Sequence, residues 1–314
     1  ILQGLLVTVY FVKLISFHEF LIYSIVIYLL ILVALALNLF ARGFRYSTAF
    51  RELRKDKLKE ILSFSSLSFI GMSAMILIGK MDSIMVSGLV GLASNAIYTT
   101  AFFIATVIEV PKRAITTAAS TLIAKAFERN DLGEVRRLYE KTSINQLIIG
   151  SLLLIGIWAN ISNIFAIMPR GEVYRAGTYV VLIVGCGKLI DMAFGPSSEI
   201  IGLSKHYWFN LVVITILAVV VIISNYLLIP VLGIEGAACG TILALLVYNV
   251  AKYLFIYFRL GLQPFTASTG KVLAIGLLVL LLNSILPKAD LVMIDIGYRS
   301  SVFLVVIGAL LLDG

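Results

Sequence analysis

The sequence predicts an all-α membrane protein, a polytopic bundle of about ten transmembrane helices, and three observations support this fold class. First, 61% of the 314 residues are hydrophobic and only 13% are charged, about half the charge of a typical soluble domain. Second, the mean hydropathy is +1.05. Third, the apolar residues are gathered in stretches long enough to cross a hydrocarbon core, which takes about 20 residues of helix. A transmembrane barrel would show short alternating segments instead.

Short loops separate the apolar stretches, and no loop is long enough for a soluble domain. Of the six prolines, four lie near the ends of stretches, where helix breakers belong. Pro111 and Pro196 lie inside stretches and predict kinks, which neighbouring helices can stabilise in a membrane. The predicted transmembrane spans are 1–17, 21–40, 61–88, 93–125, 143–167, 174–202, 207–229, 234–258, 271–287 and 297–313.

Basic residues are concentrated in alternate loops, and this indicates the orientation of the helices. The loops at 41–60 and 126–142 are strongly basic, whereas the loops on the other side hold few basic residues. The positive-inside rule therefore places these two loops, and both ends of the chain, in the cytoplasm. The segment ERNDLGEVRRLYEK predicts a short amphipathic cytoplasmic helix, with Asn130 or Asp131 available to cap it. Because the basic residues follow this membrane pattern, the net charge of +8 does not indicate a nucleic-acid partner.

Several other kinds of site are not indicated by the sequence. Cys186 and Cys239 lie in apolar surroundings, so neither a disulfide framework nor a metal site is predicted. The stretch GIEGAACG at 233–240 lacks the Lys-Ser/Thr ending of a phosphate loop and predicts close helix packing instead. We expect no catalytic residues and no cofactor. Because the chain begins at Ile1 rather than at a methionine, we expect a fragment of a longer protein.

Residues 61–129 point most directly to function, because charges lie inside their two apolar spans. A charge near the bilayer centre costs roughly 2.5–3.5 kcal/mol on insertion scales, so it usually faces a bundle interior or a wet cavity. Lys80 and Asp82 lie on nearly opposite sides of a helix, so they do not pair well with each other. They are candidates to line a passage for an anionic or ion-coupled cargo. The alternative is a salt bridge to another helix, or snorkelling to the outer surface.

A second group of charges, Glu109, Lys112 and Arg113, surrounds Pro111 in the next span. Their spacing puts the acid and both bases on one face of a helix, already paired with one another. Because a proline can open the backbone there, we interpret the group as a candidate phosphate-binding patch at a bend. The alternative is a position near the cytoplasmic interface, since a helix over 93–125 would be about 48 Å long.

Three further charges lie well inside the predicted span 174–202, beyond Arg175 at its start. Lys188 and Asp191 have the spacing of neighbours on one helix face, and we expect them to form an internal structural pair. Glu199 comes about one helical turn after Pro196 and is a candidate to line a cavity at the kink. A position near the cytoplasmic end of the span is the alternative for Glu199.

Four stretches of the sequence carry a family resemblance. They are the span that contains Asp82, the run ASNAIYTTAFFIATVIEVPKRAI, the loop KAFERNDLGEVRRLYEKTSINQ and the turn LIPVLGIEGAACGTILALLVYN. With these stretches the chain resembles the polysaccharide biosynthesis protein, or oligosaccharide-lipid flippase, family, in which O-antigen flippases are found. This family belongs to the multidrug/oligosaccharidyl-lipid/polysaccharide exporter (MOP) superfamily, with the multidrug-and-toxin extrusion (MATE) transporters and the lipid II flippases. The resemblance covers nearly the whole chain from about Ile61, and more weakly the first two spans.

The resemblance implies a MATE-like fold of fourteen helices, arranged as two lobes of six followed by two additional helices. The predicted spans would then be the fifth to the fourteenth helices, so the chain would be the C-terminal part of a two-lobed transporter, without its first four helices. The implied domains are 1–40 as the end of the first lobe, 41–60 as a basic cytoplasmic linker, 61–260 as the second six-helix lobe, and 271–313 as the additional pair.

The resemblance also implies a function: translocation of a polyprenyl-diphosphate-linked oligosaccharide across the bacterial cytoplasmic (inner) membrane by alternating access, in the assembly of a surface polysaccharide such as lipopolysaccharide. Its implied partners are that lipid-linked substrate, membrane lipids, a coupling H⁺ or Na⁺ ion and the polysaccharide polymerase machinery, and no nucleic acid. The candidate substrate-binding residues are Lys80, Lys112, Arg113 and Lys188, and the candidate ion-coupling or cavity residues are Asp82, Glu109, Asp191 and Glu199.

Three competing interpretations remain at the level of the sequence. A drug or cation antiporter of the same superfamily predicts a cavity dominated by carboxylates and aromatic residues, whereas the intramembrane charges here are mixed. A membrane glycosyltransferase or glycan ligase needs a polar catalytic loop outside the bilayer, and no loop on the outer side is long enough. A truncated product could also serve only in assembly.

Overall fold

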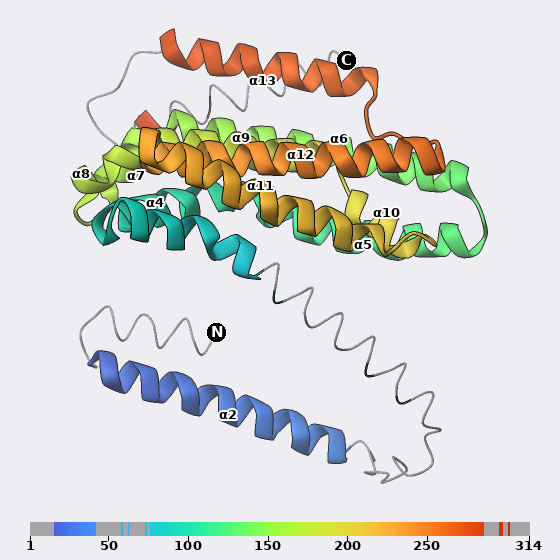
Figure 1. Ribbon diagram of the computed structural model, residues 1–314, viewed down its shortest axis with the longest axis horizontal. Helices are drawn as coiled ribbons and strands as arrows, with labels where there is room; N and C mark the ends of the chain where they lie inside the picture. The colour runs from blue at the N-terminus through green and yellow to red at the C-terminus, as the bar shows by residue number, and fades with distance from the viewer. Residues whose placement is uncertain are drawn as a thin grey trace. The chain divides into compact units, whose positions relative to one another are not determined.

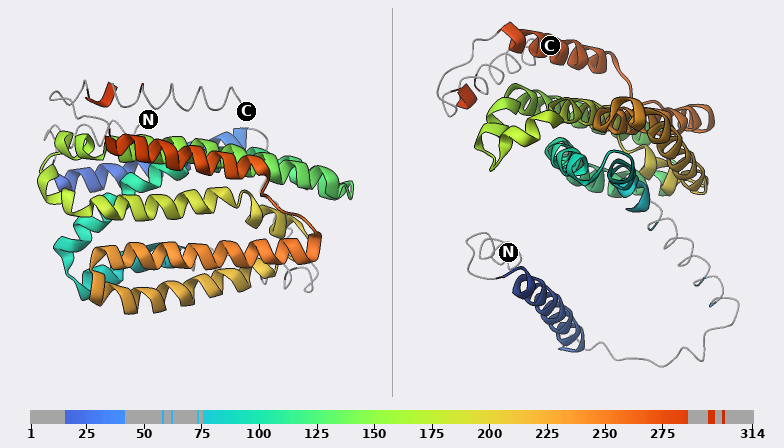
Figure 2. Two further views of the ribbon diagram at one scale, coloured as in Figure 1. Left: turned by 90° about the horizontal axis from the view of Figure 1, so that it is seen from above. Right: turned by 60° about the vertical axis from the view of Figure 1, so that its left-hand side comes forward.

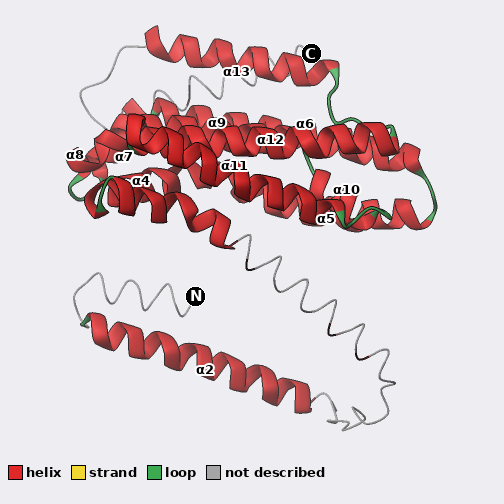
Figure 3. Ribbon diagram, in the orientation of Figure 1, coloured by secondary structure: helices red, strands yellow, loops and turns green. Residues whose placement is uncertain are grey.

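The computed structural model describes residues 16–41, 58, 62, 73, 76–285, 295–297 and 301. It divides the chain into two compact units, 1–67 and 68–314. All regular structure in the described residues is helical (Figure 3). Six of the described helices are long and apolar enough to cross a membrane, so the chain is a multi-pass membrane protein. The predicted spans 1–17 and 297–313 and the linker 41–60 lie almost wholly outside the described residues.

In the first unit, α2 extends over Phe17–Ala41 and corresponds to the predicted span 21–40. The helix starts with a capping box, in which two residues satisfy each other's backbone N–H groups. The Ser16 N–H donates to Glu19 Oε2 at 2.7 Å, and the Glu19 N–H donates to Ser16 Oγ at 3.3 Å. This pair sets the start of α2 four residues before the predicted span, because polar residues can occupy the first turn of an otherwise apolar helix.

The second unit is a bundle of long helices that run alongside one another (Figures 1 and 2). Its central helix, α9, packs against α4, α6 and α12, while α11 packs along α12 and α13 packs along α6. The elements are a helix over 76–89, α4 (Leu92–Thr106), the 3₁₀ turn η2 (Val107–Glu109), α5 (Val110–Glu128), α6 (Leu132–Ala159), α7 (Ile161–Ile167), α8 (Gly171–Tyr174), η3 (Arg175–Gly177), α9 (Thr178–Ala193), α10 (Ser197–Leu203), α11 (Phe209–Leu232), α12 (Ile234–Leu260) and α13 (Ala267–Ile285).

The prediction of a loop over 126–142 that ends before the next span is wrong, because α6 is continuous from Leu132 to Ala159. Its polar first half and its apolar second half form one helix, not a separate amphipathic helix followed by a span. The predicted cap is confirmed: Asp131 Oδ1 accepts a 2.9 Å hydrogen bond from the Glu134 N–H. Ion pairs between neighbouring turns, such as Arg137 with Glu134 at 2.9 Å, support the polar half. Polarity alone therefore does not end this helix.

Both internal prolines lie where regular α-helix is interrupted. Pro111 lies in the first turn of α5, directly after the 3₁₀ turn η2 that interrupts the long helical segment from α4 to α5. Pro196 lies in the break between α9 and α10, where Gly195 adopts a positive φ of 58°. These two breaks bring the ends of helices, and their polar groups, into the interior of the bundle.

Small residues allow the helices that surround α9 to approach closely. The buried core between α4 and α9 contains Tyr98, Ala101, Ala105, Val181 and Val184. The α11–α12 pair is similarly tight, because a side chain at Gly240 would collide with the amide of Asn225. This confirms close packing at the GIEGAACG stretch and fixes the positions of polar groups on α11 and α12.

Candidate functional site

A charged cavity of about 310 Å³ lies inside the second unit. Its walls are formed by the helix over 76–89, the α4–α5 segment, α9, α10, α11 and α12. The apolar part of the wall includes Ile78, Leu217 and Val221. The charged part consists of three carboxylates and three lysines, which are Asp82, Glu109, Asp191, Lys112, Lys188 and Lys252. Such groups inside a membrane bundle are expensive to bury, and they usually mark a path for substrate or ions.

Asp82 lies at one end of this cavity and is only 7% exposed. Its carboxylate accepts hydrogen bonds from three neutral groups: the Tyr98 hydroxyl at 3.0 Å, the Asn225 amide at 2.6 Å and the Thr241 hydroxyl at 2.5 Å. These donors come from α4, α11 and α12, so Asp82 joins its own helix to three others. The Asn225 Oδ1 atom is buried and has no hydrogen-bond partner among the described residues.

Two ion pairs cross the middle of the cavity between the η2–α5 segment and α9. Lys188 Nζ lies 2.6 Å from Glu109 Oε2. Lys112 pairs with Asp191, whose other oxygen accepts a 3.0 Å hydrogen bond from the Asn249 amide of α12. All four charged side chains are largely buried, with 11–24% of each exposed.

These partners differ from the two pairings predicted from the sequence. Lys188 does not pair with Asp191 on the same helix, and Glu109 does not pair with Lys112 or Arg113. The physical reason is that α9 and the η2–α5 segment carry their acid and base in opposite order, so each charge faces an opposite charge on the other segment. Contact across the interface then replaces contact along one helix.

Lys252 lies at the other end of the cavity and was missed by the sequence analysis. It is 3% exposed, donates a 3.2 Å hydrogen bond to Ser198 Oγ and lies 3.9 Å from the centre of the Tyr248 ring. Within the described part of the chain it forms no ion pair. The signal that could have found it is a lysine inside the predicted span 234–258, an ionisable residue at membrane depth.

Three of the eight predicted site residues lie outside this cavity. Lys80 is exposed and lines a small neighbouring cavity of about 70 Å³, which Asp82 also lines. Arg113 is exposed and lines neither cavity. Glu199 is half-buried and does not line the charged cavity, although it lies close enough to interact electrostatically with Lys112 and Lys252. The other five residues are brought together.

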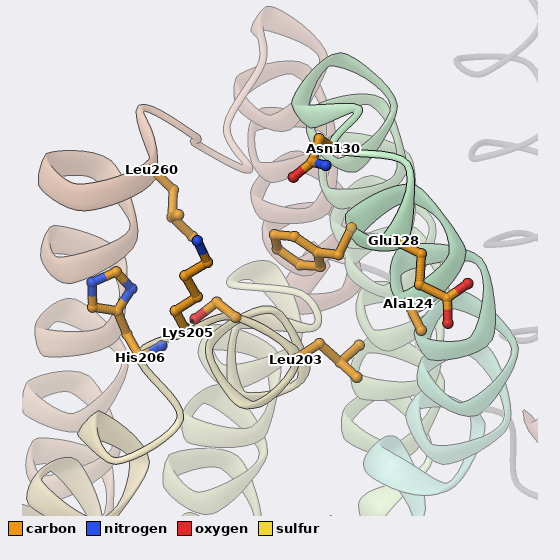
Figure 4. Close-up of a pocket in the computed structure, with 9 residues that line it drawn as sticks. Ala124, Glu128, Asn130, Leu203, Lys205, His206 and Leu260 are labelled. Carbon is orange, nitrogen blue, oxygen red and sulfur yellow. Dashed lines mark hydrogen bonds between the residues drawn. The ribbon is translucent and has the colours of Figure 1, made fainter.

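A larger cavity of about 450 Å³ lies where α5, α10 and α12 end (Figure 4). Lys205 and His206 lie on one side of it and Glu128 on the other (Figure 4). Lys205 and Glu128 are exposed, and neither forms an ion pair among the described residues. Because these charges lie at the helix ends rather than inside the bundle, the smaller charged cavity is the better candidate site.

Two solved structures share the fold of this chain. One is described as the lipid II flippase MurJ in an inward closed conformation, with a TM-score of 0.63 and 13% identity over 86% of this chain and 57% of that chain. The other is an outward-facing conformation of a multidrug resistance MATE family transporter of the MOP superfamily, with a TM-score of 0.54 and 21% identity over 69% of this chain and 51% of that chain. This chain therefore spans about half the length of each.

Comparison with protein-family models finds no matching family, and comparison with curated proteins finds no match. The likeness to the two structures is one of fold. It confirms the predicted fold class, an all-α membrane bundle of the kind found in MOP-superfamily transporters. The descriptions of the two matched proteins name a flippase and a transporter.

Proposed function

We propose that the protein containing this chain translocates a polyprenyl-diphosphate-linked oligosaccharide across a bacterial cytoplasmic membrane by alternating access. The single observation that carries this proposal is the cavity of three lysines and three carboxylates inside a membrane bundle. A lipid-linked glycan needs such a polar interior, because its diphosphate and sugars cannot cross hydrocarbon unaided. The fold shared with a lipid II flippase supports the same class of cargo.

The proposed mechanism divides the cargo among different surfaces. The charged cavity holds the diphosphate, polar surface holds the sugars, and the polyprenyl tail stays in the lipid. Two lobes rock about the binding region, so that it opens first to the cytoplasm and then to the outer side. In this proposal the described bundle belongs to the second of the two lobes.

An ion gradient is the proposed source of energy, with Asp82 as the coupling carboxylate. Asp82 is buried at one end of the cavity and accepts hydrogen bonds from three neutral donors, and it forms no ion pair with the residues that the structure describes. A carboxylate without an ion-pair partner can take up a proton or a cation in one state and release it in another. Glu109, the other coupling candidate, is already paired with Lys188 and is therefore the weaker one.

A drug or cation antiporter is the main alternative, because the fold is shared with a MATE transporter. Such a protein would be expected to present a cavity dominated by acids. The observed cavity carries as many lysines as carboxylates, which suits an anionic cargo better. The polymerase machinery of surface polysaccharide assembly remains the proposed partner.

The deciding experiment is a clean deletion of the gene, followed by mass spectrometry of the polyprenyl-linked glycans and a parallel measurement of drug sensitivity. The flippase proposal expects a finished lipid-linked oligosaccharide to accumulate and the surface polymer to disappear. Normal glycan intermediates together with increased drug sensitivity would overturn the proposal and favour the antiporter.

A further inference from the structure

We propose that Lys252, with Ser198 and Tyr248, forms the oxyanion subsite of the charged cavity and binds a phosphate group of the cargo. The proposal rests on the proposed function for the origin of that phosphate, which is the diphosphate of a lipid-linked glycan. It assigns the anion-binding role to a lysine that the sequence did not single out, rather than to Lys112 or Lys188.

The argument begins with the partners of the three lysines that line the cavity. Lys112 and Lys188 each form an ion pair with a carboxylate on the facing segment, so their charges are already neutralised. An anion could bind them only by displacing Asp191 or Glu109. Lys252 has no such partner among the described residues, and its charge is therefore the one available to a ligand.

The surroundings of Lys252 hold its ammonium group in place without neutralising it. The Tyr248 ring lies one helical turn before it on α12, with its centre 3.9 Å from Nζ. The Ser198 hydroxyl of α10 accepts one hydrogen bond from the ammonium group at 3.2 Å. An ammonium group has three N–H donors, and this is its single hydrogen bond within the described residues. The remaining donors are available to the oxygens of a phosphate.

Burial makes the absence of a counter-ion significant. Lys252 is 3% exposed, and an unpaired buried charge costs far more than a paired one. Its charged neighbours are Lys112, Asp191 and Glu199, which interact with it only at longer range. Asp191 is committed to Lys112 and Asn249. A bound oxyanion would supply the missing partner, which is the expected design of a binding site rather than of a structural salt bridge.

The position of Lys252 along α12 separates anion binding from the Asp82 end. Thr241, which donates to Asp82, and Lys252 lie on the same helix, about 16 Å apart at 1.5 Å per residue. Lys188 of one ion pair interacts electrostatically with Asp82, whereas Lys112 and Asp191 of the other pair interact with Lys252. A phosphate at Lys252 therefore avoids the uncompensated carboxylate of Asp82. Under the predicted topology, Lys252 is also the nearer of the two to the cytoplasm, where the cargo would enter.

The test measures binding to the intact purified protein in lipid nanodiscs. Two probes are titrated separately: inorganic pyrophosphate and a soluble short-chain prenyl diphosphate. We expect Lys252→Gln to raise the Kd for both probes at least about tenfold, since it removes a charge-assisted hydrogen bond. Lys252→Arg, which keeps the charge, should stay much closer to the wild type. Lys205→Gln is the matched control, because it removes an exposed lysine outside the charged cavity.

The outcomes separate the subsite from the proposed function. If the wild type binds both probes with equal affinity and Lys252→Gln loses this binding, the subsite is supported. Its ligand would then be free phosphate rather than a lipid headgroup. Unchanged binding in a folded Lys252→Gln protein, or no binding of either probe to the wild type, overturns the subsite whatever the glycan analysis shows. If Lys252→Gln does not fold, the Ser198→Ala variant provides the test, because it keeps the charge of Lys252. An unchanged Kd for both probes in Ser198→Ala would overturn the subsite.

Discussion

The Lys188 ammonium group lies 2.6 Å from the Glu109 carboxylate and joins α9 to the turn η2. One turn further along both segments, Asp191 and Lys112 form a second pair with the charges reversed. The two segments therefore present complementary charge patterns. This arrangement neutralises four charges inside the bundle and fixes the position of α9 against the break that precedes Pro111.

Reversing the charges of the first pair should show that its partners interact directly. Glu109→Lys and Lys188→Glu each place two like charges in contact, and each should lower the free energy of unfolding by about 1–3 kcal/mol, less than for a fully buried pair because both side chains are partly exposed to the cavity. The double variant should recover most of this loss. A double-mutant cycle on the protein in detergent measures it, and purely additive losses would show that the pair is not coupled.

Asp82→Asn should abolish gradient-driven transport while leaving the protein folded and at normal abundance in the membrane. The substitution keeps the size of the side chain but removes the charge that takes up a proton or cation. Transport of the lipid-linked substrate in proteoliposomes, with and without an imposed H⁺ or Na⁺ gradient, measures the effect. Lys80→Gln is the control, because Lys80 is exposed and lies outside the charged cavity. Full gradient dependence in Asp82→Asn would exclude Asp82 as the coupling group.

Gly240→Ala should destabilise the protein by roughly 1–3 kcal/mol through overpacking. The new methyl group would collide with the Asn225 amide and press on the Ser224 hydroxyl, and Asn225 is a hydrogen-bond donor to Asp82. Gly156→Ala in α6 is the matched control, because a methyl group there meets open space. It should raise stability by up to about 1 kcal/mol through helix propensity. Thermal unfolding of both variants measures the difference, and equal stability would contradict the close contact.

Gly195→Ala and Gly261→Ala should separate backbone strain from crowding. Both glycines have a positive φ, 58° and 66°, so alanine at either position costs about 1–2 kcal/mol. At Gly195 the methyl group would also lie 3.2 Å from the Ser143 Cα atom, whereas at Gly261 it meets open space. The loss at Gly195 should therefore exceed that at Gly261 by about 1–3 kcal/mol in thermal unfolding. Equal losses would mean that α6 can move away from the α9–α10 break.

The fold class followed from the sequence because its causes are local. Long apolar stretches must form helices in lipid, where every backbone polar group needs an internal partner. The helix interruptions at Pro111 and Pro196 followed for the same reason, since a proline removes a backbone donor wherever it lies. The error at α6 lay in separating the predicted amphipathic helix from the span that follows it, because the change from polar to apolar residues does not end the helix. The Arg136–Glu140 and Arg137–Glu134 pairs instead stabilise helix in that segment.

The candidate site was predicted in part, and the errors concern relations between helices. Spacing places Lys188 and Asp191 on one face of a helix, but it contains no information about which helix faces them. The observed partners are far apart in the sequence: Lys112 and Asp191, for example, are separated by 79 positions. Lys252 was missed because a single span does not show which helices surround it, and only the packing of α10 against α12 shows that it is buried.

The tight turn between α11 and α12 has a consequence for how Asp82 could respond to an ion. Gly233 joins the two helices with a positive φ, and a side chain at Gly236 would collide with the Leu228 carbonyl, so the hairpin is expected to move as one rigid body. Asn225 and Thr241 lie on its two arms and both donate to Asp82. Sliding of the helix over 76–89 past this hairpin would therefore break both hydrogen bonds in a single step. An ion that binds Asp82 would then change the position of this one helix relative to the rigid hairpin. It would not have to move several side chains independently.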